Sequence, residues 1–311
     1  MTRKKQGTGL EQSGLLKIVK KFLIKSFTMI RIRLRYRQEI SEGDENMSQK
    51  IALVTGGTSG IGLGTCRALK RRGCKVYEIS RRETGTDPAI EHLQADITKE
   101  DQVQKAVQEV YRREGRIDIL INNAGYGISG AIEFTPTEEA KKQFDVNFFG
   151  MVNVNRAVLP IMRRQHSGRI LNLSSVAGQI AIPFQAYYSA SKAAVLIYTM
   201  ALANEVRCFG IHVTAIMPGD IHTGFTAARR KNVEGDDVYE GRITRSVAVM
   251  EHDELTGIEP EDAGEFIAKK AFTAFPAPAY TLGSTYALLL TLTRFLSRRV
   301  VNYVVGKLYI R

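Results

Sequence analysis

The sequence predicts an α/β fold in which a doubly wound, mostly parallel sheet of seven strands is covered by helices on both faces. From residue 50 to about 283, short apolar runs alternate with longer helical patterns, as in a parallel sheet with helical crossovers. A glycine-rich turn, "TGGTSGIG", follows the first apolar run directly. We expect one three-layer domain (47–283), a C-terminal helical extension (284–311) and a basic N-terminal extension (1–46).

The expected elements follow this alternation. Long helices are expected at about 137–164 and 185–208, and the polar, weakly periodic stretch 219–258 predicts a loop with short helices over a site. Two amphipathic helices are expected after residue 284, where they could cover a substrate cleft, pack on a partner subunit or lie against lipid. Strands are expected near 51–55, 75–79, 92–95, 117–121, 169–173, 211–216 and 279–282.

Composition indicates a folded chain without a spanning helix or a metal site. The chain has 44 % hydrophobic and 24 % charged residues, which is ordinary for a globular protein. No apolar run reaches the roughly 18 residues of a membrane span, and lysines interrupt the N-terminal apolar stretch, so the expected location is the cytoplasm. The cysteines lack CxxC spacing and the histidines show no ligand pairing, so no metal is expected.

The positive charge is partly clustered at the N-terminus. Of a net charge of +12, residues 1–46 contribute 11 lysines and arginines against 5 acidic residues. Residues 15–25 place apolar side chains and lysines on opposite helical faces. This segment could be a membrane-surface anchor, a solvated appendage, or a stretch that is not translated, since Met47 precedes the first motif. Net charge alone would suggest nucleic-acid binding, which we do not expect.

The glycine-rich turn predicts a dinucleotide site of the Rossmann type. Gly56, Gly60 and Gly62 lie between a strand and a helix, where missing side chains let the backbone approach a pyrophosphate and the helical amides point at its charge. The alternative is an ordinary glycine-rich turn that binds nothing.

The end of the second strand favours NADP(H) over NAD(H). An acidic residue there would bond the ribose hydroxyl of NAD, whereas arginine accommodates the phosphate of NADP. Ser80 stands at the acidic position, followed by Arg81 and Arg82, although an arginine pair could also be a solvated turn. Asp96, after the third strand, is expected to bond the adenine amino group or to cap the next helix, a role for which Thr98 competes.

Two adjacent tyrosines raise the question of which one does chemistry. Side chains four residues apart share a helical face, and Tyr188 has Lys192 at that spacing whereas Tyr187 has Ser191. A phenol has a pKa near 10, and an ammonium group or a bound nicotinamide cation would stabilise its charged form. The spacing therefore selects Tyr188.

A serine separates this pair from a second match. Tyr303 and Lys307 share the same spacing, which we interpret as a coincidence on a helix surface. Only Tyr188 has a serine thirteen residues earlier, Ser175, at the end of a predicted strand. Ser175 could donate a hydrogen bond to a substrate carbonyl.

Six motifs in order resemble the short-chain dehydrogenase/reductase family. They are "TGGTSGIG", "NNAG", Asn147 in "FDVNFFG", Ser175, "YSASK" and "PGDIHT", and the resemblance covers about 48–283. It implies that Tyr188 is the general acid in carbonyl reduction and the base in alcohol oxidation. Lys192 would lower the pKa of Tyr188 and bond the nicotinamide ribose, Ser175 would polarise the carbonyl, and Asn147 would hold a proton-relay water.

The resemblance also implies a cofactor site and a dimer. Asn123 to Gly125 would support the sheet beside the adenosine ribose, and Pro218, Gly219 and Thr223 would contact the carboxamide. The two long helices would pair across a two-fold axis in a homodimer, or in a tetramer if the C-terminal helices do not block the further contact. The predicted cofactor-binding residues are Gly56, Thr58, Ser59, Gly60, Ile61, Gly62, Ser80, Arg81, Arg82, Asp96, Ile97, Asn123, Ala124, Gly125, Tyr188, Lys192, Pro218, Gly219, Ile221 and Thr223.

The substrate is predicted only as a class. Side chains of the loops expected around the pocket suggest an apolar ketone or alcohol, although they could merely pack the loops, and His222 is a further candidate contact. The C-terminal tail resembles those of hydroxysteroid dehydrogenase-like and acyl-dihydroxyacetone-phosphate reductase-like members, which implies a lipid-like substrate and peripheral membrane contact. A non-catalytic NADP(H) sensor remains the alternative function. The loop residues are Tyr126, Ile128, Ile180, Ile182, Phe184 and Phe225.

Overall fold

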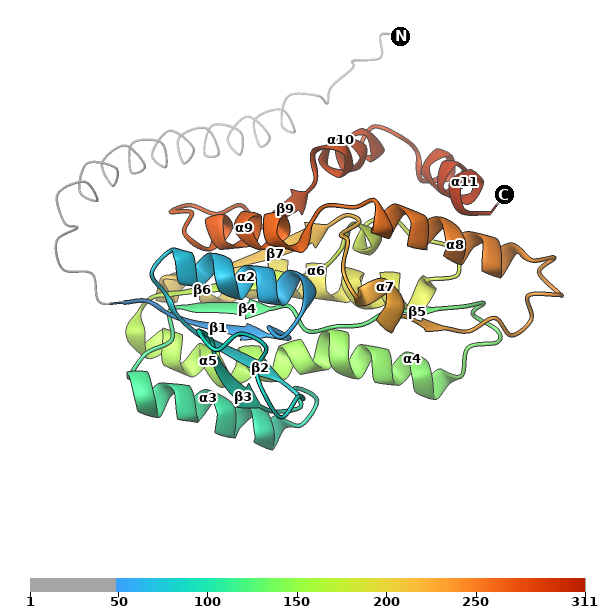
Figure 1. Cartoon of the computed structure of the whole chain (residues 1–311). Coiled ribbons are helices and arrows are strands. Elements are labelled where there is room, and N and C mark those ends of the chain that lie inside the picture. Colours follow the sequence, from blue (N-terminus) through green and yellow to red (C-terminus); the bar gives the residue numbers. More distant parts are fainter. Residues whose placement is uncertain (1–48, 311) are drawn as a thin grey trace, which may run out of the picture. The chain divides into compact units, whose positions relative to one another are not determined.

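Seven parallel strands form the central sheet of the protein. A computed structural model describes residues 49–310, so the predicted N-terminal extension, 1–46, lies outside the described residues. The strand order is β3-β2-β1-β4-β6-β7-β9, and every pairing in this sheet is parallel, which confirms the predicted doubly wound fold (Figure 1). The strands are β1 (Ile51–Thr55), β2 (Lys75–Ser80), β3 (Glu91–Gln94), β4 (Ile119–Asn122), β6 (Gly168–Leu173), β7 (Ile211–Pro218) and β9 (Ala279–Leu282).

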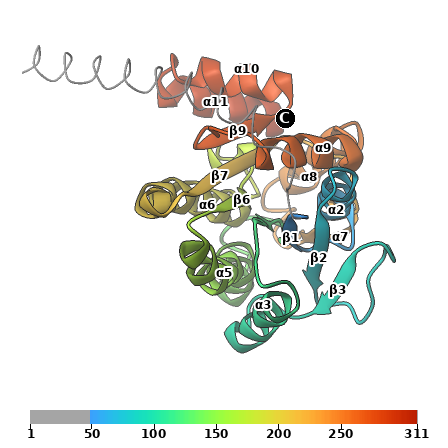
Figure 2. The same ribbon diagram turned by 90° about the vertical axis from the view of Figure 1, so that its left-hand side faces the viewer.

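Helices cover both faces of this sheet (Figure 2). One face buries apolar side chains of α3 (Glu100–Glu114), α5 (Met151–Gln165) and α6 (Ala186–Val206). The other buries those of α2 (Gly60–Arg71) and α9 (Pro260–Ala271). These last two helices touch through glycines, because a Cβ on Gly64 would lie 2.3 Å from the main-chain oxygen of Pro260.

The predicted helix at 137–164 is interrupted by a wider turn. It consists of α4 (Thr137–Phe144), a π-helical segment (Asp145–Gly150) and α5. Apolar periodicity does not reveal such a segment, which contains one extra residue per turn and often occurs at functional sites. The other long helix, α6, agrees with its prediction apart from its last turn, which continues as a short 3₁₀ segment (Arg207–Phe209).

The segment between β7 and β9 is more regular than expected. It contains α7 (Phe225–Ala228), a short β8 (Arg230–Lys231) that pairs with β5 (Ile128–Ser129), and the 14-residue helix α8 (Arg242–Leu255). The expectation of short helices alone is therefore wrong for α8.

Two helices follow β9, as predicted, and pack beside the sheet. They are α10 (Ser284–Thr293) and α11 (Arg298–Tyr309). Leu290 and Val305 insert into a small core with Leu196 of α6 and Met217 of β7. No helix in the described part of the chain is long and apolar enough to cross a membrane.

Candidate active site

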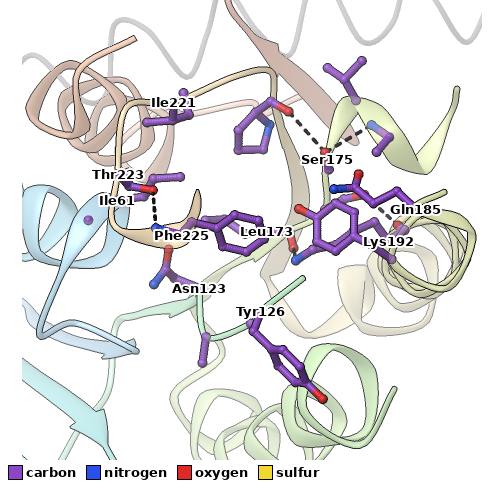
Figure 3. A pocket seen from close by; sticks show the side chains of 18 of the residues that line it. Ile61, Asn123, Tyr126, Leu173, Ser175, Gln185, Lys192, Ile221, Thr223 and Phe225 are labelled. Atoms are coloured by element: carbon purple, nitrogen blue, oxygen red, sulfur yellow. Dashed lines mark hydrogen bonds between the residues drawn. The ribbon is translucent and has the colours of Figure 1, made fainter. Parts of the chain in front are cut away.

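A large cavity lies at the carboxyl ends of the strands, where the strand order reverses between β1 and β4. Open α/β sheets bind their ligands at this position. Its volume is about 1290 Å³, above the roughly 300–1,000 Å³ of most small-molecule pockets. The sequence-predicted site residues all line it except Gly62 and Asn147. In Figure 3, Ile61 and Thr223 lie on one side of this cavity and Ser175 and Lys192 on the other.

The glycine-rich turn is held open toward the cavity. Gly56 and Gly60 adopt φ of 66° and 50°, which side chains disfavour. A Cβ on Gly62 would lie 2.1 Å from the main-chain oxygen of Gly56. Gly62 therefore packs the turn instead of lining the cavity. The Nδ2 atom of Asn123 donates to the main-chain oxygens of Thr55 and Gly56, at 3.1 Å each, and so ties the turn to the end of β4.

At the end of β2, the side chains that line the cavity are hydrogen-bond donors, and none of them is acidic. Ser80, Arg81 and Arg82 line it, and the Ser80 hydroxyl is buried without a hydrogen-bond partner among the described residues. Both arginines are exposed, and neither forms an ion pair within the described range. The neighbouring carboxylate of Glu78 is buried and bonds His92, so it does not face the cavity. Burial raises the pKa of Glu78.

Asp96 lines the cavity and does not cap a helix. Its Oδ1 accepts hydrogen bonds from the main-chain nitrogen and the hydroxyl of Thr98, at 2.9 and 2.8 Å. The following helix α3 begins later, with Lys99 at its N-cap. The alternative in which Asp96 or Thr98 caps that helix is therefore wrong.

Tyr188, not Tyr187, lines the cavity together with Ser175 and Lys192. The Ser175 hydroxyl accepts from the nitrogen of Ala177 at 3.1 Å, and its own donation to the oxygen of Pro218 is long, at 3.5 Å. A hydrogen bond this long is weak, so the Ser175 proton can be redirected to a ligand.

Burial sets the protonation of the Tyr188–Lys192 pair. Burial raises the pKa of Tyr188 to about 12, and hydrogen bonding to Ser175 opposes this rise. Burial lowers the pKa of Lys192 to about 8. The expected lowering of the Tyr188 pKa is thus absent from the protein alone. The Nζ atom of Lys192 lies 5.7 Å from the centroid of the Tyr188 ring and donates to the oxygen of Leu173 at 2.9 Å.

Asn147 lies behind this group, on the π-helical segment. Its Oδ1 accepts from the nitrogen of Tyr126 at 2.9 Å, while its Nδ2 donates to the oxygen of Tyr126 and the hydroxyl of Ser191, at 3.0 and 3.1 Å. Ser191 in turn donates to the oxygen of Tyr188 at 2.8 Å. Both polar ends of the Asn147 side chain are therefore engaged in holding the Tyr126 loop against α6.

The helices α10 and α11 form an apolar wall of the cavity that no motif specified. The apolar pattern after residue 284 predicted two amphipathic helices but left three roles open for them, which were covering a substrate cleft, packing on a partner subunit and lying against lipid. Most of the predicted loop residues line the cavity, but Ile128 is buried in β5 and Phe184 packs on Tyr239. The side chains of the wall are Tyr286, Leu289, Thr293, Leu296, Val301, Val304, Val305, Leu308 and Tyr309.

Two residues that the sequence raised as candidates or look-alikes, His222 and Tyr303, lie outside the cavity. His222 is exposed, its Nδ1 lies 3.2 Å from Oε1 of Glu259, and it does not line the cavity; its contact with a ligand stays a prediction. Tyr303, whose spacing to Lys307 imitates the Tyr188 pair, has 66 % of its surface exposed.

The cavity thus joins a glycine-rich turn to a serine, a tyrosine and a lysine, an arrangement expected of a nucleotide-dependent oxidoreductase. The short chain dehydrogenase family model matches residues 50–234. The chain belongs to the short-chain dehydrogenase/reductase family. It is an oxidoreductase that acts on an alcohol or carbonyl group.

Individual relatives agree with this assignment. The chain is 42 % identical over 225 residues to a 3-ketodihydrosphingosine reductase of Bacteroides thetaiotaomicron, covering 72 % of this chain and 84 % of the relative. A short-chain dehydrogenase from Streptomyces avermitilis superposes with a TM-score of 0.73 at 30 % identity, covering 80 % of this chain and 93 % of that one. An actinorhodin polyketide ketoreductase with NADPH has a TM-score of 0.66 at 28 % identity, covering 76 % and 97 %.

Proposed function

We propose that the protein uses NADP(H) to reduce a ketone on a long apolar chain, with Tyr188 as the proton donor. The observation that carries this proposal is the continuity of one cavity. The cavity runs from the glycine-rich turn, past Ser175, Tyr188 and Lys192, to the apolar wall of α10 and α11. Such a shape suits a nucleotide at one end and an alkyl chain at the other.

The residues present fit a nicotinamide dinucleotide. Gly56 and Gly60 line the cavity without side chains, and the buried Ser80 hydroxyl lacks a partner among the described residues at the place where the ribose phosphate would lie. Arg81 and Arg82 would neutralise that phosphate, and Asp96 would accept from the adenine amino group. Ile61, Ile221 and Thr223 would enclose the nicotinamide end.

The proposed mechanism uses the protonation states of the free protein. The bound cofactor supplies the hydride. Ser175 donates a hydrogen bond to the substrate oxygen, and Tyr188, which its raised pKa keeps protonated at neutral pH, gives that oxygen a proton. Lys192 bonds the nicotinamide ribose and, when charged, stabilises the phenolate left behind. Because the side chain of Asn147 is engaged, a relay water would have to bond its main chain.

The apolar wall supports a lipid-like substrate of the kind named for the Bacteroides relative. 3-Ketodihydrosphingosine is a ketone on a long saturated chain, and the carbon beside its carbonyl carries an amino group. Leu289, Leu296, Val304 and Leu308 line the cavity and also have exposed surface. The alkyl chain would therefore lie between α10 and α11 and cover these side chains.

Replacing Tyr188→Phe should lower kcat/KM for 3-ketodihydrosphingosine by about 10²–10⁴-fold, the usual contribution of a positioned acid. Tyr187→Phe, which removes the adjacent hydroxyl outside the cavity, should change it little. Oxidation of NADPH, followed by absorbance, measures both. Full activity in the Tyr188 variant would contradict the assigned acid, and cofactor binding without turnover by the wild type would instead favour the sensor.

Replacing Arg81→Ala together with Arg82→Ala should lower kcat/KM for NADPH by about 10- to 100-fold, because each charge-assisted hydrogen bond contributes about 1.5–3 kcal/mol. In the same variant, kcat/KM for NADH should stay nearly equal to that of the wild type. Lys99→Ala removes an exposed cation outside the cavity and serves as the control. Equal losses with both cofactors would refute the assignment of the phosphate to this pair.

We further propose that α10 and α11 contact an anionic lipid surface. Exposed apolar side chains occur on both helices and in their connection, led by Phe295 at 82 % exposure, and the same segment contains Arg294, Arg298 and Arg299. Residues 284–311 contain no acidic residue, so the segment complements negative headgroups.

Phe295→Ser should weaken co-sedimentation with phosphatidylserine-containing vesicles by roughly tenfold, since burying such a side chain contributes about 1.5–3 kcal/mol. Arg298→Glu should weaken it further and remove the preference over phosphatidylcholine vesicles. The control is Val238→Ser, which changes another exposed apolar residue, at 67 % exposure. Vesicle binding equal in all these proteins would exclude the proposed surface.

A homodimer is proposed through the long helices α5 and α6. Phe149, at the end of the π-helical segment, and Ile197 and Met200 on α6 are exposed by 52 %, 65 % and 43 %. Phe148, beside the first of these, packs edge-on against Tyr198 of α6. The exposed side chains therefore lie on neighbouring elements and suit an isologous contact.

The wild-type mass in light scattering coupled to gel filtration should be that of a dimer, and Ile197→Glu should give a monomer because it would bury a charge in the contact. Val238→Glu adds the same charge elsewhere and should leave the dimer intact. A monomeric wild type would disprove this contact.

A further inference from the structure

Two carboxylates, Asp220 and Glu254, line the cavity outside the residues placed in proton transfer. Glu254 is already neutralised. The guanidinium of Arg229, whose side chain is fully buried, pairs with it, and the hydroxyl of Thr226 donates to its Oε2 at 2.6 Å. Both oxygens of Glu254 are therefore engaged by side chains of the protein itself.

Asp220 differs because it has no cationic partner. Its Oδ2 accepts a hydrogen bond from the Tyr286 hydroxyl of α10, and none of the basic side chains in 49–310 forms an ion pair with it. Burial raises the pKa of this carboxyl, and the charges of Asp253 and Glu254 add to that rise, whereas the hydrogen bond from Tyr286 and the charge of Arg229 oppose it. A carboxylate in such surroundings is stabilised by any cation that reaches it.

Asp220 lines the same cavity as Ser175 and Tyr188. Asp220 follows Pro218 and Gly219, and the oxygen of Pro218 is the acceptor that faces the Ser175 hydroxyl. The charge of Asp220 is also close enough to raise the pKa of Tyr188. A charged group on the carbon beside a carbonyl held by Ser175 and Tyr188 would lie within reach of the Asp220 carboxylate.

We propose that Asp220 is a specificity residue that binds an ammonium group on the carbon adjacent to the substrate ketone. This rests on the proposed function and deepens it, since it selects long-chain amino ketones over neutral ketones. An amino group beside a carbonyl resembles the α-amino group of a peptide, with a pKa of about 7.7–8.0. It therefore carries a positive charge in most molecules at neutral pH.

The test compares 3-ketodihydrosphingosine with the ketone of equal chain length that lacks the amino group. The wild type should prefer the amino ketone by about 10- to 100-fold in kcat/KM, as a charge-assisted hydrogen bond of about 1.5–3 kcal/mol implies. Asp220→Asn should lose this preference and keep its activity on the neutral ketone within about twofold of the wild type.

Two further variants distinguish recognition from a structural tether. Tyr286→Phe breaks the hydrogen bond to α10 and keeps the carboxylate, so it should retain the preference for the amino ketone. Asp253→Asn removes a neighbouring charge that does not line the cavity and should retain it too. Equal losses on both ketones in Asp220→Asn, or loss of the preference in either control, would overturn the proposal.

A binding measurement keeps this inference separate from the proposed reaction. Calorimetry would compare octylamine with octanol on the NADP-bound wild type and on Asp220→Asn. The amine should bind the wild type more tightly, and the variant should not distinguish the two ligands. If the wild type reduced neither ketone, the proposed reaction would fail, and the amine result would still decide the role of Asp220. Equal amine binding by both proteins would overturn it.

Discussion

The site depends on the hydrogen bonds that join the ends of β1 and β4. The Thr55 hydroxyl accepts from the main-chain nitrogens of Asn123 and Ala124, at 3.1 Å each, and the Asn123 amide returns two bonds to Thr55 and Gly56. These strands are neighbours in the sheet but lie 63 or more residues apart in the chain. Their connection holds the glycine turn at the reversal of strand order, and the cavity opens beside it.

Desolvation gives the site its chemical character. The same burial that raises the pKa of Tyr188 lowers that of Lys192, because a low-dielectric surrounding disfavours the charged form of either group. At neutral pH, Tyr188 is therefore an uncharged phenol, while Lys192, with a pKa of about 8, still carries its charge in most molecules. A positive charge brought beside the phenol would act strongly, since little water screens it.

Local patterns predicted most of the fold. The strands at 51–55 and 279–282 have their predicted bounds, because short apolar runs between turn residues carry their own signal. The selection of Tyr188 over Tyr187 also needed only helical spacing, and the cavity contains the predicted member of the pair.

Features set by tertiary contact could not be predicted. The π-helical segment that carries Asn147 has the same apolar pattern as an α-helix, and nothing in the tail sequence shows which surface Leu290 and Val305 will meet. Gly62 was expected beside a ligand because a glycine motif does not distinguish contact with a ligand from contact with the backbone. The partner of Glu78 depended on the register of β2 with β3, in which Glu78 lies opposite His92.

The wall formed by α10 and α11 has one face toward the cavity and another toward the outside. Leu289, Leu296, Val304 and Leu308 belong to both, since they line the cavity and remain partly exposed. A molecule that reorders these side chains from outside changes the free energy of filling the cavity. By reciprocity, a ligand inside must change the affinity for that outer molecule by the same factor. Under the proposed attachment to a lipid surface, occupancy of the cavity and attachment to that surface would report the same equilibrium.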